Sequence, residues 1–379
     1  MVMDLAFSEE QEMLKTMARD FLTDKLPKEV VKEIEESEPG YLPELWREMA
    51  ELGWVGLVLP EQYGGGGMGF LDLAVLLEEI GRACLPGPYF STVVLGGLPI
   101  LDAGSEEQKQ TYLPEIASGE TIFTLALTEP NARYDAAAIE VKATAEGDTY
   151  ILSGTKLFVP DAHIADYMLV VARTDEKSED EDGITVFIVN AKSPGISCTV
   201  LKTIANDKLC EVVFNQVSVP GGNILGQLNQ GWSEVQKTVQ RAAAAKCCEI
   251  VGCIQQALDM TIDYAKERKQ FDRPIGSFQI IQHYCADMAT DVDGARLSTY
   301  QAAWMISEGL PCAQEVAVAK AWISEASQRI MALAHQIHGA IGYSIDHDLQ
   351  YYTRRAKAAE VTFGDASFYR EVVAQGMGL

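Results

Sequence analysis

The sequence predicts a multidomain α+β protein with an N-terminal helical domain, a middle β-barrel or β-sandwich domain and a C-terminal four-helix bundle. The main observation is that the period of the apolar residues changes from helical to strand-like and back along the chain. The 379 residues, 47% of them apolar, are also too many for one ordinary hydrophobic core. We place the three domains at residues 1–122, 123–228 and 229–379.

Helix signals dominate the first domain. Ser8 is followed by Glu residues in the first turn of FSEEQEMLKTMARDFL, which is typical of a capped helix start. Two further helices are predicted for LPELWREMAELG and LDLAVLLEEIGRACL. Between these two lies EQYGGGGMGF, which follows no clear strand and lacks a Lys-Ser or Lys-Thr ending. We therefore expect a flexible connection there rather than a phosphate-binding loop.

Short apolar or alternating stretches, divided by Gly, Asn, Asp and Pro, indicate strands in the middle domain. The clearest are TYILSG, YMLVVART, GITVFIV and CEVVFNQVSV. The acidic run DEKSEDEDG, residues 175–183, lies between two of these strands. It is predicted to be a solvated hairpin loop.

Long helices return after Gly231, with small or apolar residues at steps of three and four. One face comprises Cys247, Val251, Ile254, Leu258, Ile262 and Ala265. A second comprises Ala317, Lys320, Ser324, Ser327, Met331, Ala334 and Ile337. Faces of this kind favour a tightly packed helix bundle.

Charge and cysteine content exclude several classes of protein. The chain has 30 basic and 55 acidic residues, a formal charge of −25 that repels nucleic acids and anionic lipids. No apolar run approaches the roughly 18 residues of a membrane span, and the start MVMDLAFSEEQEML lacks a basic segment and a cleavage site. The eight cysteines form no CxxC pair and no disulfide framework. We expect a soluble, cytoplasmic protein with buried thiols and no metal site.

Two middle-domain segments resemble parts of a known family. The first is LALTEPNARYD, residues 125–135, and the second is GTKLFVPDAHIAD, residues 154–166. The first is similar to the segment of acyl-CoA dehydrogenases whose main chain lies along the flavin ring, although Arg133, Tyr134 and Asp135 replace the usual Gly-Ser-Asp. The second is similar to the family strand in which Trp-Ile-Thr or Trp-Ile-Ser packs on the flavin.

Two C-terminal segments extend the resemblance. YAKERKQFDRPIGSFQIIQH, residues 264–283, carries the family's Arg, aromatic and Phe-Gln signature. AHQIHGAIGYSIDHDLQYYTRRAK, residues 334–357, is similar to the Gln-Ile-x-Gly-x-x-Gly-Tyr segment that, in the family, reaches the dinucleotide end of FAD across a subunit boundary. With all four segments in order, the chain is identified as a member of the acyl-CoA dehydrogenase family over nearly its whole length.

The resemblance implies FAD as the cofactor. The implied cofactor-binding residues are Leu127, Thr128, Phe158, Pro160, Arg268, Phe271, Gln279, Gln336, Gly339, Ala340, Phe363 and Asp365. Main-chain groups of Leu127 and Thr128 can bind the polar edge of the ring without adding charge. Phe158 can stack on the ring in place of Trp, whereas Pro160 lacks the hydroxyl that donates to flavin N5 in the family.

The pyrophosphate of the cofactor needs cationic or N–H donors, which Arg268 and the amides around Gly339 can supply. A solvated helix charge is the alternative role for Arg268. For Gln336 and Gly339 the alternative is close helix packing or a helix end.

The family resemblance also implies a reaction. Family enzymes remove the proton alpha to a thioester while the beta hydrogen leaves as hydride to flavin N5, and the developing enolate is stabilised at the carbonyl oxygen. One donor to that oxygen is the main-chain N–H of the residue most members use as base, a Glu in Tyr-Glu-Gly-Thr. Here Thr362, Phe363, Gly364 and Asp365 match that sequence. The main-chain donor survives at Phe363, but the proton acceptor does not.

No carboxylate stands at the family's other base position either, which aligns near Ala242. Asp365 could act as base if desolvation raises its pKa; its alternative roles are a hydrogen bond to the cofactor or a helix N-cap. Glu249 is the second candidate, and an ion pair with Lys246 one turn earlier is its alternative role. Glu129 is expected to cap local structure.

The resemblance implies substrate contacts at Phe90, Ser91, Tyr134, Arg241, Lys246, Phe363 and Gly364. Phe90 and Ser91 match the helix that closes the acyl pocket, and with Lys246 they favour a short branched, cyclic or carboxylated acyl group. Helix packing is the alternative for these three residues. Arg241 could reach a CoA phosphate or be a surface charge.

The leading functional hypothesis is an FAD-dependent acyl-CoA dehydrogenase that passes electrons to electron-transfer flavoprotein, as a homotetramer or dimer of dimers. A non-catalytic, FAD-binding subunit of a mixed oligomer is the first alternative, because both usual base positions lack an acid. A flavin oxidase or monooxygenase on the same scaffold is the second.

Overall fold

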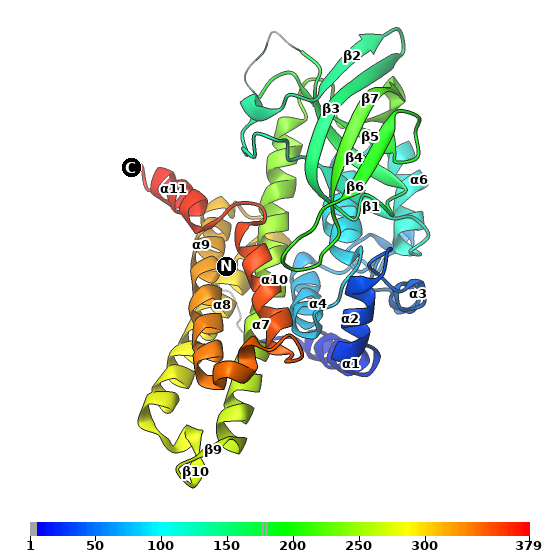
Figure 1. The fold of residues 1–379 in the computed structure, drawn as a ribbon. Helices are drawn as coiled ribbons and strands as arrows, with labels where there is room; N and C mark the ends of the chain where they lie inside the picture. The colour runs from blue at the N-terminus through cyan, green and yellow to red at the C-terminus, as the bar shows by residue number, and fades with distance from the viewer. Residues whose placement is uncertain (1–5, 176–177, 179–180) are drawn as a thin grey trace. The chain divides into compact units, whose positions relative to one another are not determined.

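The computed structural model describes residues 6–175, 178 and 181–379. The chain divides into two compact units (Figure 1), each drawing on separated stretches of sequence. Unit 1 comprises Met1–Lys32, Gly69–Leu85 and Ala242–Leu379, and unit 2 comprises Glu33–Met68 and Pro86–Arg241. Part of the N-terminal helical segment therefore packs with the C-terminal helices.

Unit 1 is helical. Its elements are α1 (Glu9–Lys25), α4 (Phe70–Ala83), α7 (Trp232–Glu267) from residue 242 onward, β9 (Lys269–Gln270), β10 (Arg273–Pro274), η5 (Ile275–Ser277), α8 (Gln279–Ser307), α9 (Ala313–His338), η6 (Gly339–Tyr343), α10 (Leu349–Val361) and α11 (Ala366–Gly376). Helix α9 packs against α8, α10 and α11, while α4 packs against α1 and α8 (Figure 1). Helix α2 (Lys28–Glu36) is divided between the two units.

The predicted capped start of the first helix is confirmed. The Ser8 hydroxyl accepts a hydrogen bond from the Gln11 amide at 3.2 Å, and the Gln11 side chain accepts one from the Ser8 amide at 3.1 Å. This reciprocal pair satisfies two amides that the helix itself cannot bond. Helix α1 therefore begins where the sequence predicts.

Helices α4 and α7 approach each other at two glycines. A Cβ atom on Gly81 would lie 1.9 Å from the carbonyl oxygen of Glu249, and one on Gly252 would lie 1.8 Å from that of Glu78. Any side chain at these positions would force the helices apart. The two backbones are consequently in direct contact close to Glu249.

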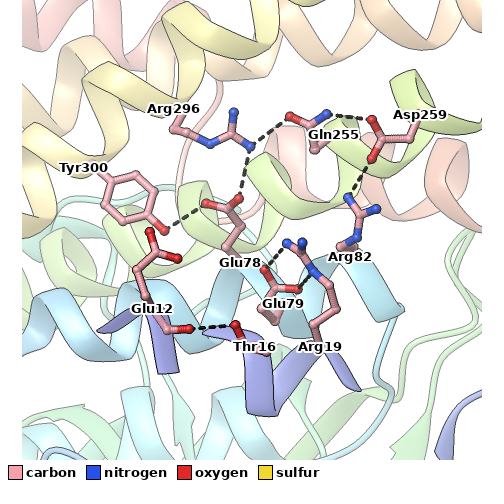
Figure 2. A network of polar contacts seen from close by, with 10 residues as sticks. All are labelled: Glu12, Thr16, Arg19, Glu78, Glu79, Arg82, Gln255, Asp259, Arg296 and Tyr300. Carbon is pink, nitrogen blue, oxygen red and sulfur yellow. Dashed lines mark hydrogen bonds and ion pairs between the residues drawn. The ribbon is translucent and has the colours of Figure 1, made fainter. Parts of the chain in front are cut away.

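Two buried acids on α4 are bonded by cations from other helices, as Figure 2 shows. Glu79 accepts hydrogen bonds from Arg19 of α1 at 2.7 and 3.0 Å. Glu78 accepts one from Arg296 at 3.0 Å and one from the Tyr300 hydroxyl at 2.8 Å, both from α8. Because buried carboxylates require such partners, this network fixes α1, α4 and α8 together.

Unit 2 contains a mixed eight-stranded sheet. Its strands are β1 (Phe123–Ala126), β2 (Lys142–Glu146), β3 (Thr149–Pro160), β4 (Tyr167–Arg173), β5 (Ile184–Asn190), β6 (Ile196–Val200), β7 (Leu209–Pro220) and β8 (Ile224–Leu225). They run in the order β6-β7-β3-β2-β4-β5-β8, and β1 pairs in parallel with β4. All four predicted strand segments are strands. Of the acidic run, residues 176–177 and 179–180 lie outside the described residues.

The helices of unit 2 are short. They are α3 (Pro43–Glu51), η1 (Glu61–Tyr63), η2 (Phe90–Gly97), α5 (Leu98–Ala103), α6 (Glu106–Ala117), η3 (Ala136–Ala138) and η4 (Gly221–Asn223). The glycine run after η1 forms a packed turn where the sequence predicted a flexible connection. Gly66 donates to the Gly56 carbonyl at 2.9 Å, and a Cβ on Gly65 would lie 2.1 Å from the Leu59 carbonyl oxygen.

The predicted helix faces are largely confirmed. The face of α9 listed above is buried at every position, Lys320 included, and that of α7 is buried except at Ile262. All eight cysteines are free, and six are buried; Cys198 is exposed and Cys285 half-buried, so the prediction of buried thiols is wrong at those two positions. Within the described part of the chain, no helix has both the length and the apolar character needed to cross a membrane.

Candidate active site

The segment Leu127–Glu129 follows β1 and is bonded to β3. The Leu127 carbonyl accepts a hydrogen bond from the ammonium of Lys156 at 2.9 Å, and the Thr128 carbonyl accepts one from the Leu157 amide at 2.8 Å. Both residues are half-buried. These bonds fix the main chain that the family resemblance assigns to the flavin edge.

Lys156 and Glu129 form a buried ion pair at 2.7 Å. The Glu129 carboxylate also accepts the backbone amides of Glu140 at 2.7 Å and Val141 at 3.1 Å, so its expected structural role agrees with its contacts. Burial lowers the pKa of Lys156 to about 8. Sequence reasoning missed Lys156, although a lysine in a strand that is otherwise mostly apolar was a usable signal.

Phe158 lies on a β-bulge. The register of β3 against β7 shifts between Lys156 and Val159, and Phe158 adopts a φ of 55° with half of its side chain exposed. Bulges re-aim side chains out of the regular pleat. The Pro160 carbonyl accepts the Thr124 hydroxyl at 2.5 Å, so this residue too is fixed by β1.

The Arg133-Tyr134-Asp135 segment is exposed. Arg133 and Asp135 form a bidentate pair at 2.9 and 3.0 Å on either side of Tyr134. Exposed pairs of this kind contribute little to stability. A substrate contact at Tyr134 stays a prediction.

Ser91 belongs to the π-helical element η2, a rare conformation that often occurs at functional sites. Its side chain is fully buried and its hydroxyl donates to the carboxylate of Asp161 at 2.6 Å. The hydroxyl is therefore bonded within unit 2, which agrees with helix packing. The neighbouring Phe90 is half-buried, and substrate contact at either residue stays a prediction.

Arg241 is ion-paired with Asp102 at the end of α5. Lys237 contacts the same carboxylate at 3.1 Å. A phosphate ligand at Arg241 would therefore have to compete with an existing carboxylate. This role stays a prediction.

In unit 1, the loop between α10 and α11 contains the residues that match the family's base segment. Phe363 has a φ of 59° and Gly364 a φ of 102°. The left-handed conformation costs a non-glycine residue about 1–2 kcal/mol. The loop is bonded at this residue and directly after it: the Phe363 carbonyl accepts the Tyr369 hydroxyl at 2.8 Å, and the Gly364 carbonyl accepts the Lys320 ammonium at 2.8 Å.

Asp365 is the N-cap of α11. Its carboxylate oxygen Oδ1 accepts the Phe368 amide at 2.8 Å, and the residue is exposed. Carboxylates are favoured at this position by the unbonded amides and the helix dipole. The burial that was expected to raise its pKa is absent in the single chain, whereas the N-cap alternative matches the observed geometry.

Glu249 and Lys246 form an ion pair on α7, with 18% of each side chain exposed. This is the alternative that the sequence raised for Glu249. A carboxylate paired with a cation is a weak proton acceptor, because the neighbouring charge stabilises its ionised form. Its role as base stays a prediction.

Lys320 is the main residue of this region that sequence reasoning missed. It lies in the middle of α9, is fully buried, and donates to the carbonyls of Ala359, Glu360 and Gly364 and to the Ser324 hydroxyl. Burial lowers its pKa to about 8, with smaller influences from Cys247, Lys246, Glu360 and Asp365. Lys246 and Asp365 therefore lie near the same buried cation.

The residues predicted to bind the dinucleotide end of FAD lie elsewhere on unit 1. Arg268 precedes the β9–β10 hairpin, whose turn carries Phe271 with 86% of its surface exposed. Arg268 and Gln279 are also exposed, and among the described residues the Arg268 guanidinium has no hydrogen bond or ion pair. At roughly 1.5 Å per residue, α7 separates this hairpin from Lys246 by about 30 Å.

Gly339 ends α9 with φ 65° and ψ −142°, a region essentially restricted to glycine. The reversal leaves Gln336 and Ala340 exposed. Two stacked ring pairs lie near this reversal: His338 on Tyr264, with ring centroids 4.5 Å apart, and His335 on Tyr343, with ring centroids 4.6 Å apart. Burial lowers the pKa of both histidines.

Within unit 1 the structure thus brings Lys246, Phe363 and Asp365 close to Lys320, but it separates them from the hairpin residues. Phe158, Leu127 and their neighbours belong to unit 2. Of the predicted residues among these, the sequence resemblance assigned Lys246 to the substrate and the others to FAD. Binding of the dinucleotide end across a subunit boundary, which the resemblance implies for residues 334–357, stays a prediction.

The chain is similar to known proteins over nearly its whole length. Models of the N-terminal, middle and C-terminal domains of acyl-CoA dehydrogenases match residues 8–120, 124–217 and 229–378. The probable acyl-CoA dehydrogenase YngJ of Bacillus subtilis is 35% identical, covering 98% of this chain and 99% of its own. The caffeyl-CoA reductase-Etf complex subunit CarC of Acetobacterium woodii is 35% identical, covering 98% of each.

A chain of the ChsE4-ChsE5 complex from Mycobacterium tuberculosis has the same fold. It superposes with a TM-score of 0.91 at 30% identity and with 99% coverage of both chains. Three domain models in the expected order and full-length relatives establish the assignment that the four sequence segments predicted. The chain belongs to the acyl-CoA dehydrogenase family.

Proposed function

We propose that this protein is an FAD-dependent oxidoreductase that introduces a double bond between the alpha and beta carbons of an acyl-CoA thioester. The observation that carries the proposal is the loop at Phe363. By the sequence match, Phe363 supplies the main-chain N–H that binds the thioester oxygen in family members, and the Lys320 ammonium and the Tyr369 hydroxyl bond the Gly364 and Phe363 carbonyls of this left-handed segment. Preorganised donors of this kind stabilise a developing oxyanion.

The residues present fit FAD. Phe158 exposes half of an aromatic side chain on a bulge, as a stacking surface requires. Arg268 is an exposed cation without a partner among the described residues, and Gly339 has no atom within 4 Å of its missing Cβ. When bound, FAD would accept the hydride from the beta carbon. The residues of this chain would position the thioester and remove the alpha proton.

Asp365 is our proposed base. It is two residues from Phe363. Its oxygen Oδ1 accepts the Phe368 amide, whereas Oδ2 accepts no hydrogen bond within the part of the chain that the structure describes. That oxygen is available to a proton. Glu249 is the second candidate, but its carboxylate is occupied by the ion pair with Lys246.

The proposed electron acceptor is electron-transfer flavoprotein, since CarC of Acetobacterium woodii is named as a subunit of an Etf complex. The proposed substrate has a short branched, cyclic or carboxylated acyl group, because the family resemblance assigns Phe90, Ser91 and Lys246 to the acyl pocket. A homotetramer or dimer of dimers would supply the hairpin residues from a neighbouring subunit.

The test is anaerobic mixing of the purified, FAD-containing protein with a panel of short branched, cyclic and dicarboxylic acyl-CoAs. Loss of the oxidised-flavin absorbance with at least one thioester is expected. Transfer of the electrons to electron-transfer flavoprotein rather than to oxygen would separate a dehydrogenase from an oxidase or monooxygenase.

A second function is favoured by one observation: Phe363 replaces the usual base, while Asp365 caps a helix and Glu249 is paired. These features suit a non-catalytic subunit of a mixed oligomer, and ChsE4 and ChsE5 form a complex of two named proteins. Stable FAD binding without bleaching by any thioester would support this alternative and end the first proposal.

A further inference from the structure

Lys320 is a buried cation without an acidic partner. Its side chain is fully buried, and among the described residues no carboxylate lies within ion-pair distance of its ammonium. Buried lysines are rare unless they are paired, because removing the charge from water is unfavourable. The position therefore requires a compensating set of acceptors.

Those acceptors are carbonyls at the end of α10 and in the following loop. The ammonium donates to Ala359 at 3.1 Å and Glu360 at 2.9 Å, in the last turn of α10, and to Gly364 at 2.8 Å in the loop. The Ser324 hydroxyl lies at 3.2 Å. Carbonyls of a last helical turn have no partner within the helix and attract positive charge.

The bonds of Lys320 span Phe363. Glu360 lies three residues before it and Gly364 directly after it, so one side chain connects the helix end to the far side of the left-handed residue. The Tyr369 hydroxyl binds the Phe363 carbonyl itself at 2.8 Å. The main chain is therefore bonded at the Glu360 carbonyl, two peptides before the one that carries the Phe363 N–H, and at the Phe363 carbonyl directly after it.

We propose that Lys320 is a positioning residue whose ammonium holds the Glu360–Gly364 segment in the conformation that directs the Phe363 N–H at the thioester oxygen. This inference rests on the proposed function for its catalytic consequence, but the positioning itself is a property of the chain alone. The charged and titratable groups that face Lys320 are Lys246 and Cys247 from α7, Glu360 from α10 and Asp365 from the start of α11.

The first test is hydrogen exchange of the backbone amides from Ala359 to Asp365 in the purified full-length protein. Lys320→Met should accelerate exchange in this segment by at least about tenfold, because local opening no longer breaks bonds to the ammonium. Ser327→Ala is the matched control, since Ser327 is a buried polar residue of the same helix whose hydroxyl, among the described residues, bonds to the Ser324 carbonyl alone. Unchanged exchange in Lys320→Met would overturn the proposal.

The second test is catalytic. Lys320→Met should lower the rate of flavin reduction by about ten- to a hundredfold with little change in FAD content, and Lys320→Arg should restore part of the rate. The carbonyl stretching frequency of a bound, isotope-labelled thioester should move toward its value in water. A loss of overall stability without a change at the thioester oxygen would not shift this frequency. Faster amide exchange together with an unchanged rate of flavin reduction and an unchanged carbonyl stretching frequency would refute the proposed effect of Lys320 on catalysis.

Should Lys320→Met fail to fold, Lys320→Gln keeps a neutral donor and carries the same expectations. The outcome also separates the two proposals. If the wild-type flavin is reduced by no thioester, the proposed function fails, while hydrogen exchange still decides whether Lys320 holds the loop.

Discussion

Lys156 of unit 2 and Lys320 of unit 1 are both fully buried lysines, but they are compensated differently. Lys156 pairs with the Glu129 carboxylate at 2.7 Å and also binds the Leu127 carbonyl. Within the described part of the chain, Lys320 binds three carbonyls and a hydroxyl and no carboxylate. Each lysine binds a main-chain carbonyl in a segment that the resemblance assigns to the active site. Among the described residues, the buried charge has a counter-ion in unit 2 and main-chain acceptors alone, apart from one hydroxyl, in unit 1.

The largest expected effect follows from the carboxylate in unit 2. Lys156→Met leaves the buried Glu129 carboxylate with two backbone amides but no counter-ion, so the free energy of unfolding should fall by about 3–5 kcal/mol. Denaturant unfolding measures this. The double variant Lys156→Met/Glu129→Gln should recover much of the loss, because it removes both charges. Equal stability of the single and double variants would show that the pair is not coupled.

The next effect concerns the segment that Lys320 holds. Asp365→Asn should lower flavin reduction at least about a hundredfold, since the amide cannot accept the alpha proton. Stability should change little, because Asn is also a good N-cap. Stopped-flow absorbance with an active thioester measures the rate. Reduction at the wild-type rate would assign Asp365 to capping alone and leave Glu249 as the candidate.

A smaller effect on stability is expected for Lys320→Met. Unsatisfied buried acceptors cost about 1–3 kcal/mol, but the variant leaves no buried charge behind and removes one. Its free energy of unfolding should therefore fall by less than that of Lys156→Met. A larger loss than in Lys156→Met would reverse the comparison between the two lysines.

The smallest effect is a pH dependence. The pKa of Lys320 is lowered to about 8 from its ordinary value of 10.5, so the unfavourable burial of its charge is fully present below pH 8 and diminishes as the pH rises toward 10.5. Relative to Lys320→Met, the wild-type protein should gain about 1 kcal/mol of unfolding free energy between pH 8 and pH 9. Denaturation at the two pH values measures the difference. A constant difference would mean that Lys320 titrates normally.

Much of the fold was predictable because it depends on local patterns. The capping box at Ser8, the strand segments and the buried face of α9 were all read from residue spacing. The packing of α1 and α4 with the C-terminal helices was not, since it depends on contacts such as Gly81 against Glu249 that lie far apart in sequence. The glycine run after η1 was mistaken for a flexible connection for another reason: its close packing on the Gly56 and Leu59 carbonyls is not apparent from its composition.

Site residues that belong to a sequence motif were predictable. Those that act through buried contacts were not. The resemblance indicated the loop at Phe363, yet it gave no indication that Lys320 and Tyr369 hold that loop. Lys320 appeared in the sequence as one member of an apolar face, which was itself a signal, because a lysine among small residues must find acceptors. Which acceptors it finds depends on how α9 packs against α10.

The most direct test is a structure of the FAD-bound protein with a non-reactive acyl-CoA analogue. The account predicts that the thioester oxygen lies about 3 Å from the Phe363 nitrogen, in the range of an N–H···O hydrogen bond. A thioester oxygen bound by other groups, with the Phe363 amide directed away from it, would contradict the account.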